Sequence, residues 1–143
     1  MGKKIRTLVD SVSAAWNRHD APGFASLFSG DALLRIVATG HIMHGREQIR
    51  EFAEDFLMAF PELRFDRRST HDCSEAVCVI ESTLTATHEG EFMGIPPTYR
   101  SVELLSCSIF TLGVDRLIGE ETFYFDAATL LRQLGALPES ANA

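Results

Sequence analysis

The pattern of hydrophobic and polar positions changes its period at Pro61. Before Pro61, apolar residues recur at the spacing of one helical face, which is typical of amphipathic helices. The spacing predicts long helices over residues 5–16 and 46–60. A short helix between them is expected to begin after the capping residue Asp20 and to end at residues 29–31.

After Pro61, apolar side chains alternate with polar ones, as in β-strands. The expected strands lie at 63–68 and 76–88 with a turn at 71–72, and a hairpin with a tight turn at 113–115 follows them. Before Pro61, a β-rich run at 33–38 and a connection at 41–45 are expected between the short helix and the helix at 46–60. A last helix is expected to start at Asp126. Helices followed by one antiparallel sheet predict an α+β fold with helices on one sheet face. No repeat or linker interrupts residues 1–143, so one domain is expected.

Composition removes several classes of function. The chain has 143 residues, of which 45% are hydrophobic, and a formal charge of −7, which argues against a nucleic-acid partner. No apolar run approaches the length of a membrane helix, and the first residues do not resemble a signal peptide. A cytoplasmic protein without membrane contact is therefore expected. Three cysteines without a CxxC pair favour neither a disulfide framework nor a thiolate zinc site.

One carboxylate, that of Glu121, lies on an otherwise apolar face of a predicted strand. Glu121 shares its strand face with Phe123 and Phe125. Loss of water would raise the pKa of Glu121 and suit it to remove a proton next to a carbonyl group. The alternative is a bulged strand that turns Glu121 to solvent, like Glu120.

A tight hairpin would place further side chains around Glu121. The expected ligand-binding wall consists of Leu105, Cys107, Ile109 and Phe123, with Cys107 opposite Glu121. The opposite sheet face would then carry Ser106, Ser108, Phe110, Thr122 and Tyr124, with Thr83 and Thr85. That face has few charges, and we expect a homodimer contact there.

The helices and loops add candidates of lower specificity. Trp16, Phe52 and Phe56 could hold a planar ring, although aromatic residues at helical spacing usually belong to the core. His44 is a candidate acid at the pocket mouth. His41 lies three residues from His44, but no third ligand accompanies them, so neither a metal nor another cofactor is expected.

Several segments resemble one known family. The strings HEGEFMGIPPT at 88–98, IGEE at 118–121 and the segment 125–135 are similar to SnoaL-like polyketide cyclases and ester cyclases. These belong to the superfamily of nuclear transport factor 2 and ketosteroid isomerases. The resemblance spans nearly the whole chain. It implies a cone-shaped curved antiparallel or mixed sheet wrapped around about three N-terminal helices, a C-terminal helix, a blind apolar pocket and commonly a homodimer.

The resemblance also implies a chemistry, which is cofactor-free acid/base catalysis on a small hydrophobic carbonyl compound, aromatic or polyketide-like. The family's acid/base Asp and helper His align with Phe123 and Ile109, neither of which can move a proton. The resemblance preserves Asp126, which is thus a catalytic candidate, yet its place before a helix favours a capping role. Two other functions stay open, a non-catalytic ligand-binding module and a dimeric adaptor. A cavity of roughly several hundred Å³ that contains Glu121 would favour the enzyme, one lined only by apolar groups would favour the binding module, and a filled one would favour the adaptor.

Overall fold

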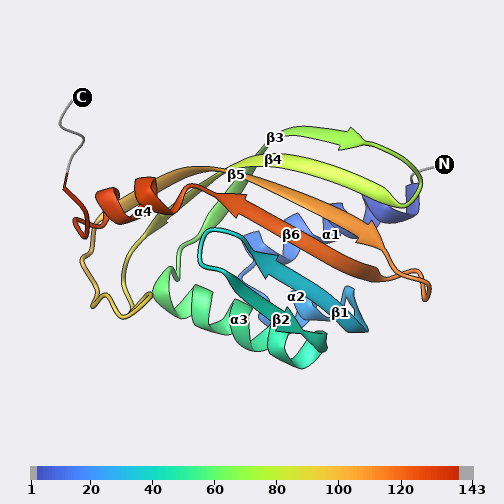
Figure 1. Ribbon diagram of the computed structural model, residues 1–143, viewed down its shortest axis with the longest axis horizontal. Helices are drawn as coiled ribbons and strands as arrows, with labels where there is room; N and C mark the ends of the chain where they lie inside the picture. The colour runs from blue at the N-terminus through green and yellow to red at the C-terminus, as the bar shows by residue number, and fades with distance from the viewer. Residues whose placement is uncertain (1–2, 139–143) are drawn as a thin grey trace.

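Among the residues that the structure describes, a curved sheet of six strands with helices against one face forms the body of the protein (Figure 1). The computed structural model describes residues 3–138. The helices are α1 (Lys3–Asn17), α2 (Ala21–Ala25), α3 (Gly45–Ala59) and α4 (Ala127–Gln133). The strands are β1 (Phe28–Ile36), β2 (His41–His44), β3 (Arg64–Asp72), β4 (Val77–Thr87), β5 (Ser101–Leu112) and β6 (Ile118–Phe125).

The sheet is mixed and does not close into a barrel. Its strand order is β2-β1-β6-β5-β4-β3, so β2 and β3 are the edge strands. β1 runs parallel to β6, and the other neighbours are antiparallel. The predicted α+β architecture, with a curved mixed sheet around the N-terminal helices and a helix at the C-terminal end, is confirmed.

Amphipathic helices cover the inner sheet face. The apolar stripe of α1, which includes Ile5, Val9 and Val12, is almost fully buried, and Ile49 and Ala53 of α3 face the same core. Burying a large apolar side chain stabilises the fold by about 1.5–3 kcal/mol, so this face determines where the helices pack. No helix in residues 3–138 has both the length and the apolar composition needed to cross a lipid bilayer.

Three local predictions were wrong. The short helix ends at Ala25, and residues 28–31 begin β1, because Phe28 pairs with Ile118 of β6. Residues 41–44 form strand β2, since the turn at Gly40 folds them back on β1. Residues 71–72 belong to β3, where they pair with Val79 and Cys78 of β4 instead of forming a turn.

The register of the β5–β6 hairpin also differs from the prediction. Glu121 pairs with Phe110, and Cys107 pairs with Tyr124. The connection runs from Gly113 to Leu117, where the Gly113 N–H donates to the Leu117 carbonyl, and a bulge follows Thr111. A shift by an odd number of residues exchanges the two faces of a strand. The even-numbered residues of β5 therefore face the core.

Candidate active site

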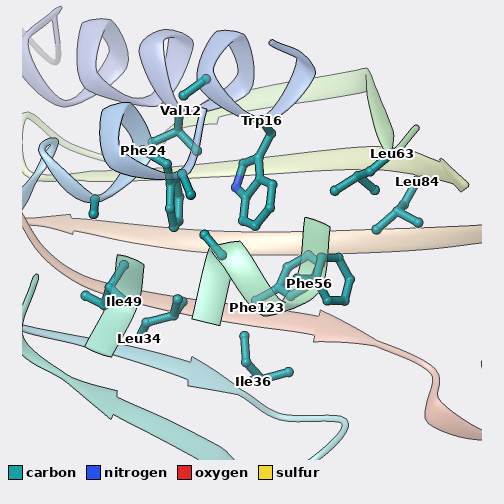
Figure 2. Packing of buried hydrophobic residues seen from close by; sticks show 14 of the residues in the cluster. Val12, Trp16, Phe24, Leu34, Ile36, Ile49, Phe56, Leu63, Leu84 and Phe123 are labelled. Carbon is teal, nitrogen blue, oxygen red and sulfur yellow. The ribbon is translucent and has the colours of Figure 1, made fainter. Parts of the chain in front are cut away.

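An internal cavity lies between the helices and the inner sheet face. Figure 2 shows Trp16 and Phe24 extending from the helices toward Phe123 of β6. The cavity is lined by Val12, Ser13, Trp16, Phe24, Leu34, Ile36, Phe52, Phe56, Phe65, Ile80, Ser82, Ser108, Phe110, Glu121 and Phe123. Its free volume for the centres of water molecules is about 30 Å³. That is room for roughly one or two water molecules.

Glu121 is the one ionisable residue among the described residues that line this cavity. Its exposed fraction is 5%, so the prediction that it shares the buried face of β6 is confirmed. The Ser108 hydroxyl donates to Oε2 at 2.9 Å, whereas the buried Oε1 has no hydrogen-bond partner within residues 3–138. Burial raises the pKa of Glu121 to about 7, and the bond from Ser108 lowers it by a smaller amount. Glu121 can therefore accept or donate a proton near neutral pH.

Seven of the fifteen described residues that line the cavity are aromatic. The ring centre of Trp16 lies 4.7 Å from that of Phe24, 5.9 Å from that of Phe56 and 5.8 Å from that of Phe65. Phe65 in turn lies 6.0 Å from Phe123. Flat side chains in tilted and edge-on contact leave narrow spaces between them. The wall suits a flat apolar molecule.

A larger groove adjoins the cavity on its outer side. Ile36, Phe52 and Phe56 line both spaces. The groove has about 730 Å³ of free volume, and it extends over Met43, Phe92 and other residues of β2, α3, β6 and the segment after β4. Phe52 is half-buried and stacks on Phe56 with ring centres 5.6 Å apart. Phe52, Phe56 and Ile36 are thus shared by the groove and the cavity that contains Glu121.

The remaining wall candidates lie away from the cavity. Leu105, Cys107 and Ile109 occupy the outer sheet face, and Leu105 is 68% exposed. Burial, together with the nearby charge of Glu81, raises the pKa of the Cys107 thiol, which disfavours the thiolate. The prediction that Cys107 lies opposite Glu121 was wrong, because the longer turn shifts the register of β5.

Two candidate catalytic residues are also remote from the cavity. His44 precedes α3, where its backbone N–H donates to Gln48, and it lines neither the cavity nor the groove. Asp126 precedes α4 and accepts a hydrogen bond from the Thr129 hydroxyl, which holds the pKa of that carboxyl below its usual value. Both residues occupy positions typical of helix starts.

Sequence reasoning missed Ser108, Ser13, Phe24 and Phe65 as lining residues. Ser108 was assigned to the outer face, although Leu104 and Phe110 of the same parity are the buried residues of β5. That apolar flank is the signal that could have placed Ser108 beside Glu121. Ser13 lies within the apolar stripe of α1, between Val12 and Trp16, and such an interruption can mark a site.

The sequence matches the family model of SnoaL-like polyketide cyclases over residues 6–134. No protein of curated function matches it significantly.

Several solved structures share the fold. AclR of Streptomyces galilaeus, a candidate hydroxylase, is 29% identical with a TM-score of 0.82, and the match covers 98% of this chain and 85% of AclR. IdmH of Streptomyces antibioticus, a candidate polyketide cyclase, is 23% identical with a TM-score of 0.75, covering 91% of this chain and 97% of IdmH. TsrD of Streptomyces laurentii is 21% identical with a TM-score of 0.80, covering 94% and 97%.

Proposed function

The chain belongs to the SnoaL-like polyketide cyclase family, and we propose that it is an acid/base catalyst that needs no cofactor and acts on a small hydrophobic carbonyl compound. Glu121 is the general base. It removes a proton from the carbon next to the carbonyl group, and the substrate rearranges by isomerisation or ring closure.

The observation that carries this proposal is the unpartnered Oε1 of Glu121 inside the apolar cavity. A buried polar atom without a hydrogen bond costs about 1–3 kcal/mol, so a structural role alone gives no reason to keep a carboxyl group there. Ser108 fixes Oε2 and leaves Oε1 as the oxygen that takes the proton. A pKa of about 7 keeps a large fraction of the base form at neutral pH.

The cavity walls indicate the class of substrate. Trp16, Phe24, Phe56 and Phe123 favour a flat, largely apolar ring system. The present free volume is too small for such a ring, so the substrate enters from the outer groove as Phe52 moves aside. In an isomerisation, the proton held on Oε1 returns to a different carbon. In a ring closure, the enolate carbon attacks a second carbonyl group of the same molecule, and the alkoxide that forms takes the proton from Oε1 of Glu121.

A second function is favoured by Phe123. The resemblance places the family's catalytic Asp at this position, and a phenylalanine there makes the cavity more apolar. A ligand receptacle without turnover would need Phe123 and the other rings but not the proton of Glu121. A substitution of Glu121 therefore separates the two functions, because the catalyst would lose its activity and the receptacle would still bind its ligand.

We also propose that the protein forms a homodimer through the outer sheet face. Leu105, Ile109 and Tyr124 lie there together with Thr83 and Thr122, and none of these side chains is charged. Leu105 and Tyr124 are 68% and 41% exposed in the single chain. Exposed apolar and aromatic residues with few charges are typical of the centre of an interface.

The catalytic proposal can be tested without knowing the natural substrate. In deuterated water, the protein should accelerate exchange of the protons next to the carbonyl of 2-tetralone, a bicyclic aromatic ketone, as followed by NMR. Glu121→Gln should lower this rate by about 100-fold or more, because a general base contributes that much. Glu120→Gln is the matched control, since Glu120 is the neighbouring carboxylate and pairs with Arg35 outside the cavity. Equal rates in wild type and Glu121→Gln would leave the receptacle as the function.

A further inference from the structure

A second polar group faces the cavity from helix α1. Ser13 lines the same space as Glu121, but it comes from the helix side and Glu121 from the sheet. Its hydroxyl oxygen accepts a hydrogen bond of 2.6 Å from Nη2 of Arg67. Within residues 3–138, the Ser13 hydroxyl donates to no protein acceptor. Its hydrogen is thus free to point into the cavity.

Arg67 forms several hydrogen bonds with residues of α1. Its Nη1 donates to Asp10 at 2.6 Å, and its Nη2 also approaches the Val9 carbonyl at 3.4 Å. The Nε atom is buried and has no partner among the described residues. A guanidinium with only one carboxylate partner retains positive potential toward its other contacts. A hydroxyl that accepts from such a cation becomes a stronger donor, because hydrogen bonds in a chain polarise one another.

We propose that Ser13, polarised by Arg67, binds the substrate's carbonyl oxygen and stabilises the negative charge that forms on it. This inference rests on the proposed function, because it assigns the oxygen-binding side of the same cavity. Ser13 is then a catalytic residue that touches the substrate, and Arg67 is a positioning residue that acts through it. The substrate class narrows to ketones or enols whose oxygen reaches α1 while the adjacent carbon faces β6.

The step balances without any further reactant. The C–H bond breaks, its proton goes to Oε1 of Glu121, and its electron pair forms a carbon–carbon double bond as the carbonyl oxygen becomes an enolate. The Ser13 hydroxyl donates to that oxygen and keeps its own proton. A preorganised donor aimed at a developing oxyanion is among the largest contributors to catalysis of this kind.

Binding of 2-naphthol tests the inference without turnover, because its neutral and ionised forms differ in absorbance. The measurement uses the full chain carrying Glu121→Gln, in which the amide stands for the protonated carboxyl group and removes its charge. Adding Ser13→Ala should lower the ratio of bound naphtholate to bound naphthol about tenfold at a fixed pH, since a hydrogen bond to a charged group is lost. Ser13→Thr should restore the ratio, because it keeps the hydroxyl.

The other variants separate polarisation from structure. Arg67→Met should lower the ratio about threefold while Ser13 stays in place, because the donor remains but loses its cation. Ser11→Ala is the matched control on the same helix and should leave the ratio unchanged, since Ser11 does not line the cavity. An unchanged ratio in Ser13→Ala, a loss confined to Ser82→Ala, or no binding of naphthol at all would each overturn the inference.

The naphthol-binding result for Ser13 and the proton-exchange result for Glu121 can fail independently of each other. If Glu121→Gln leaves exchange unaffected but Ser13→Ala lowers the naphtholate ratio, the oxygen site stands and the general base is wrong. If Glu121→Gln abolishes exchange and Ser13→Ala leaves the ratio unchanged, the base stands and Ser13 has no part. If Ser13→Ala does not fold, the ratio of bound naphtholate to bound naphthol in Arg67→Met tests the oxygen site instead.

Discussion

At the scale of single residues, Glu121 is costly to keep. Its burial raises the pKa to about 7 from a usual value of 4.5. The folded protein therefore binds a proton that the unfolded chain releases between these two values. Stability is highest when the group is protonated in both states, and it falls as the pH rises through this interval. At one pKa unit per 1.36 kcal/mol, the loss is about 3 kcal/mol.

Glu121→Gln should remove this pH dependence. We expect the variant and the wild type to have similar free energies of unfolding at about pH 4, and the variant to be more stable by about 2–3 kcal/mol at about pH 8. Urea denaturation at both pH values measures the difference. Glu120→Gln should show no such gain, because Glu120 is partly exposed and paired with Arg35. The difference in free energy of unfolding between wild type and Glu121→Gln could instead be the same at both pH values. That result would mean that Glu121 contacts water.

Glu121 could be found in the sequence because apolar residues flank it at two-residue spacing. The same reasoning failed for Leu105, Cys107 and Ile109, because the two faces of β5 have similar polarity in the sequence. The inner face carries Ser108 next to the cavity and Ser106 against the Ser82 carbonyl, whereas the outer face is more apolar at these positions. The apolar pattern of residues 105–109 alone therefore selects the wrong face, whereas Leu104 and Phe110 on either side indicate the right one.

At the scale of secondary-structure elements, the position of Glu121 depends on the connection between β5 and β6. The helices were predictable because their apolar stripes are long, and α1 and α3 begin and end near the expected residues. The hairpin was not, because Gly113 and Asp115 indicate a turn without giving its length. The structure has a longer turn in which Arg116 adopts a positive φ of 67°, and Asp115 accepts from Ser29. A bond to a residue so distant in sequence leaves no local signal.

Helix α3 controls access to the cavity through Phe52. Phe52→Ala should join the cavity to the outer groove, because the ring lines both spaces and only Ile36 and Phe56 of their shared lining remain among the described residues. We expect association of 2-naphthol to become about tenfold faster by stopped-flow fluorescence. The protein should lose about 1–3 kcal/mol of stability, less than for a fully buried phenylalanine.

Leu57→Ala is the control for the Phe52 variant, since Leu57 is also half-buried on α3 but lines neither space. It should reduce stability without changing the association rate. If both variants bind naphthol at the wild-type rate, the route to Glu121 does not pass Phe52.

At the scale of the whole molecule, the sheet separates two surfaces with different tasks. Its inner face encloses the cavity under the helices, and no helix of the part of the chain that the structure describes covers the middle of β5 and β6 on the outer face (Figure 1). Because side chains alternate along a strand, the register that brings Ser108 to Glu121 also turns Leu105 and Ile109 outward. The outer face holds other residues of β5 than predicted, and it also carries the carboxylates of Glu81, Glu103 and Glu120. A second copy of the chain packed on this face would bury them.

Leu105→Glu should therefore dissociate the proposed dimer. Two copies related by a two-fold axis would each place this carboxylate in the interface centre, where an unpaired charge is strongly unfavourable. Sedimentation velocity over a range of concentrations should show a dimer for wild type and a monomer for the variant. Val114→Glu adds the same charge at the fully exposed hairpin turn and should leave the dimer intact. A wild type that stays monomeric at all concentrations would contradict the dimer proposal. If Leu105→Glu loses the dimer but exchanges the protons of 2-tetralone at the wild-type rate, each cavity works within one chain.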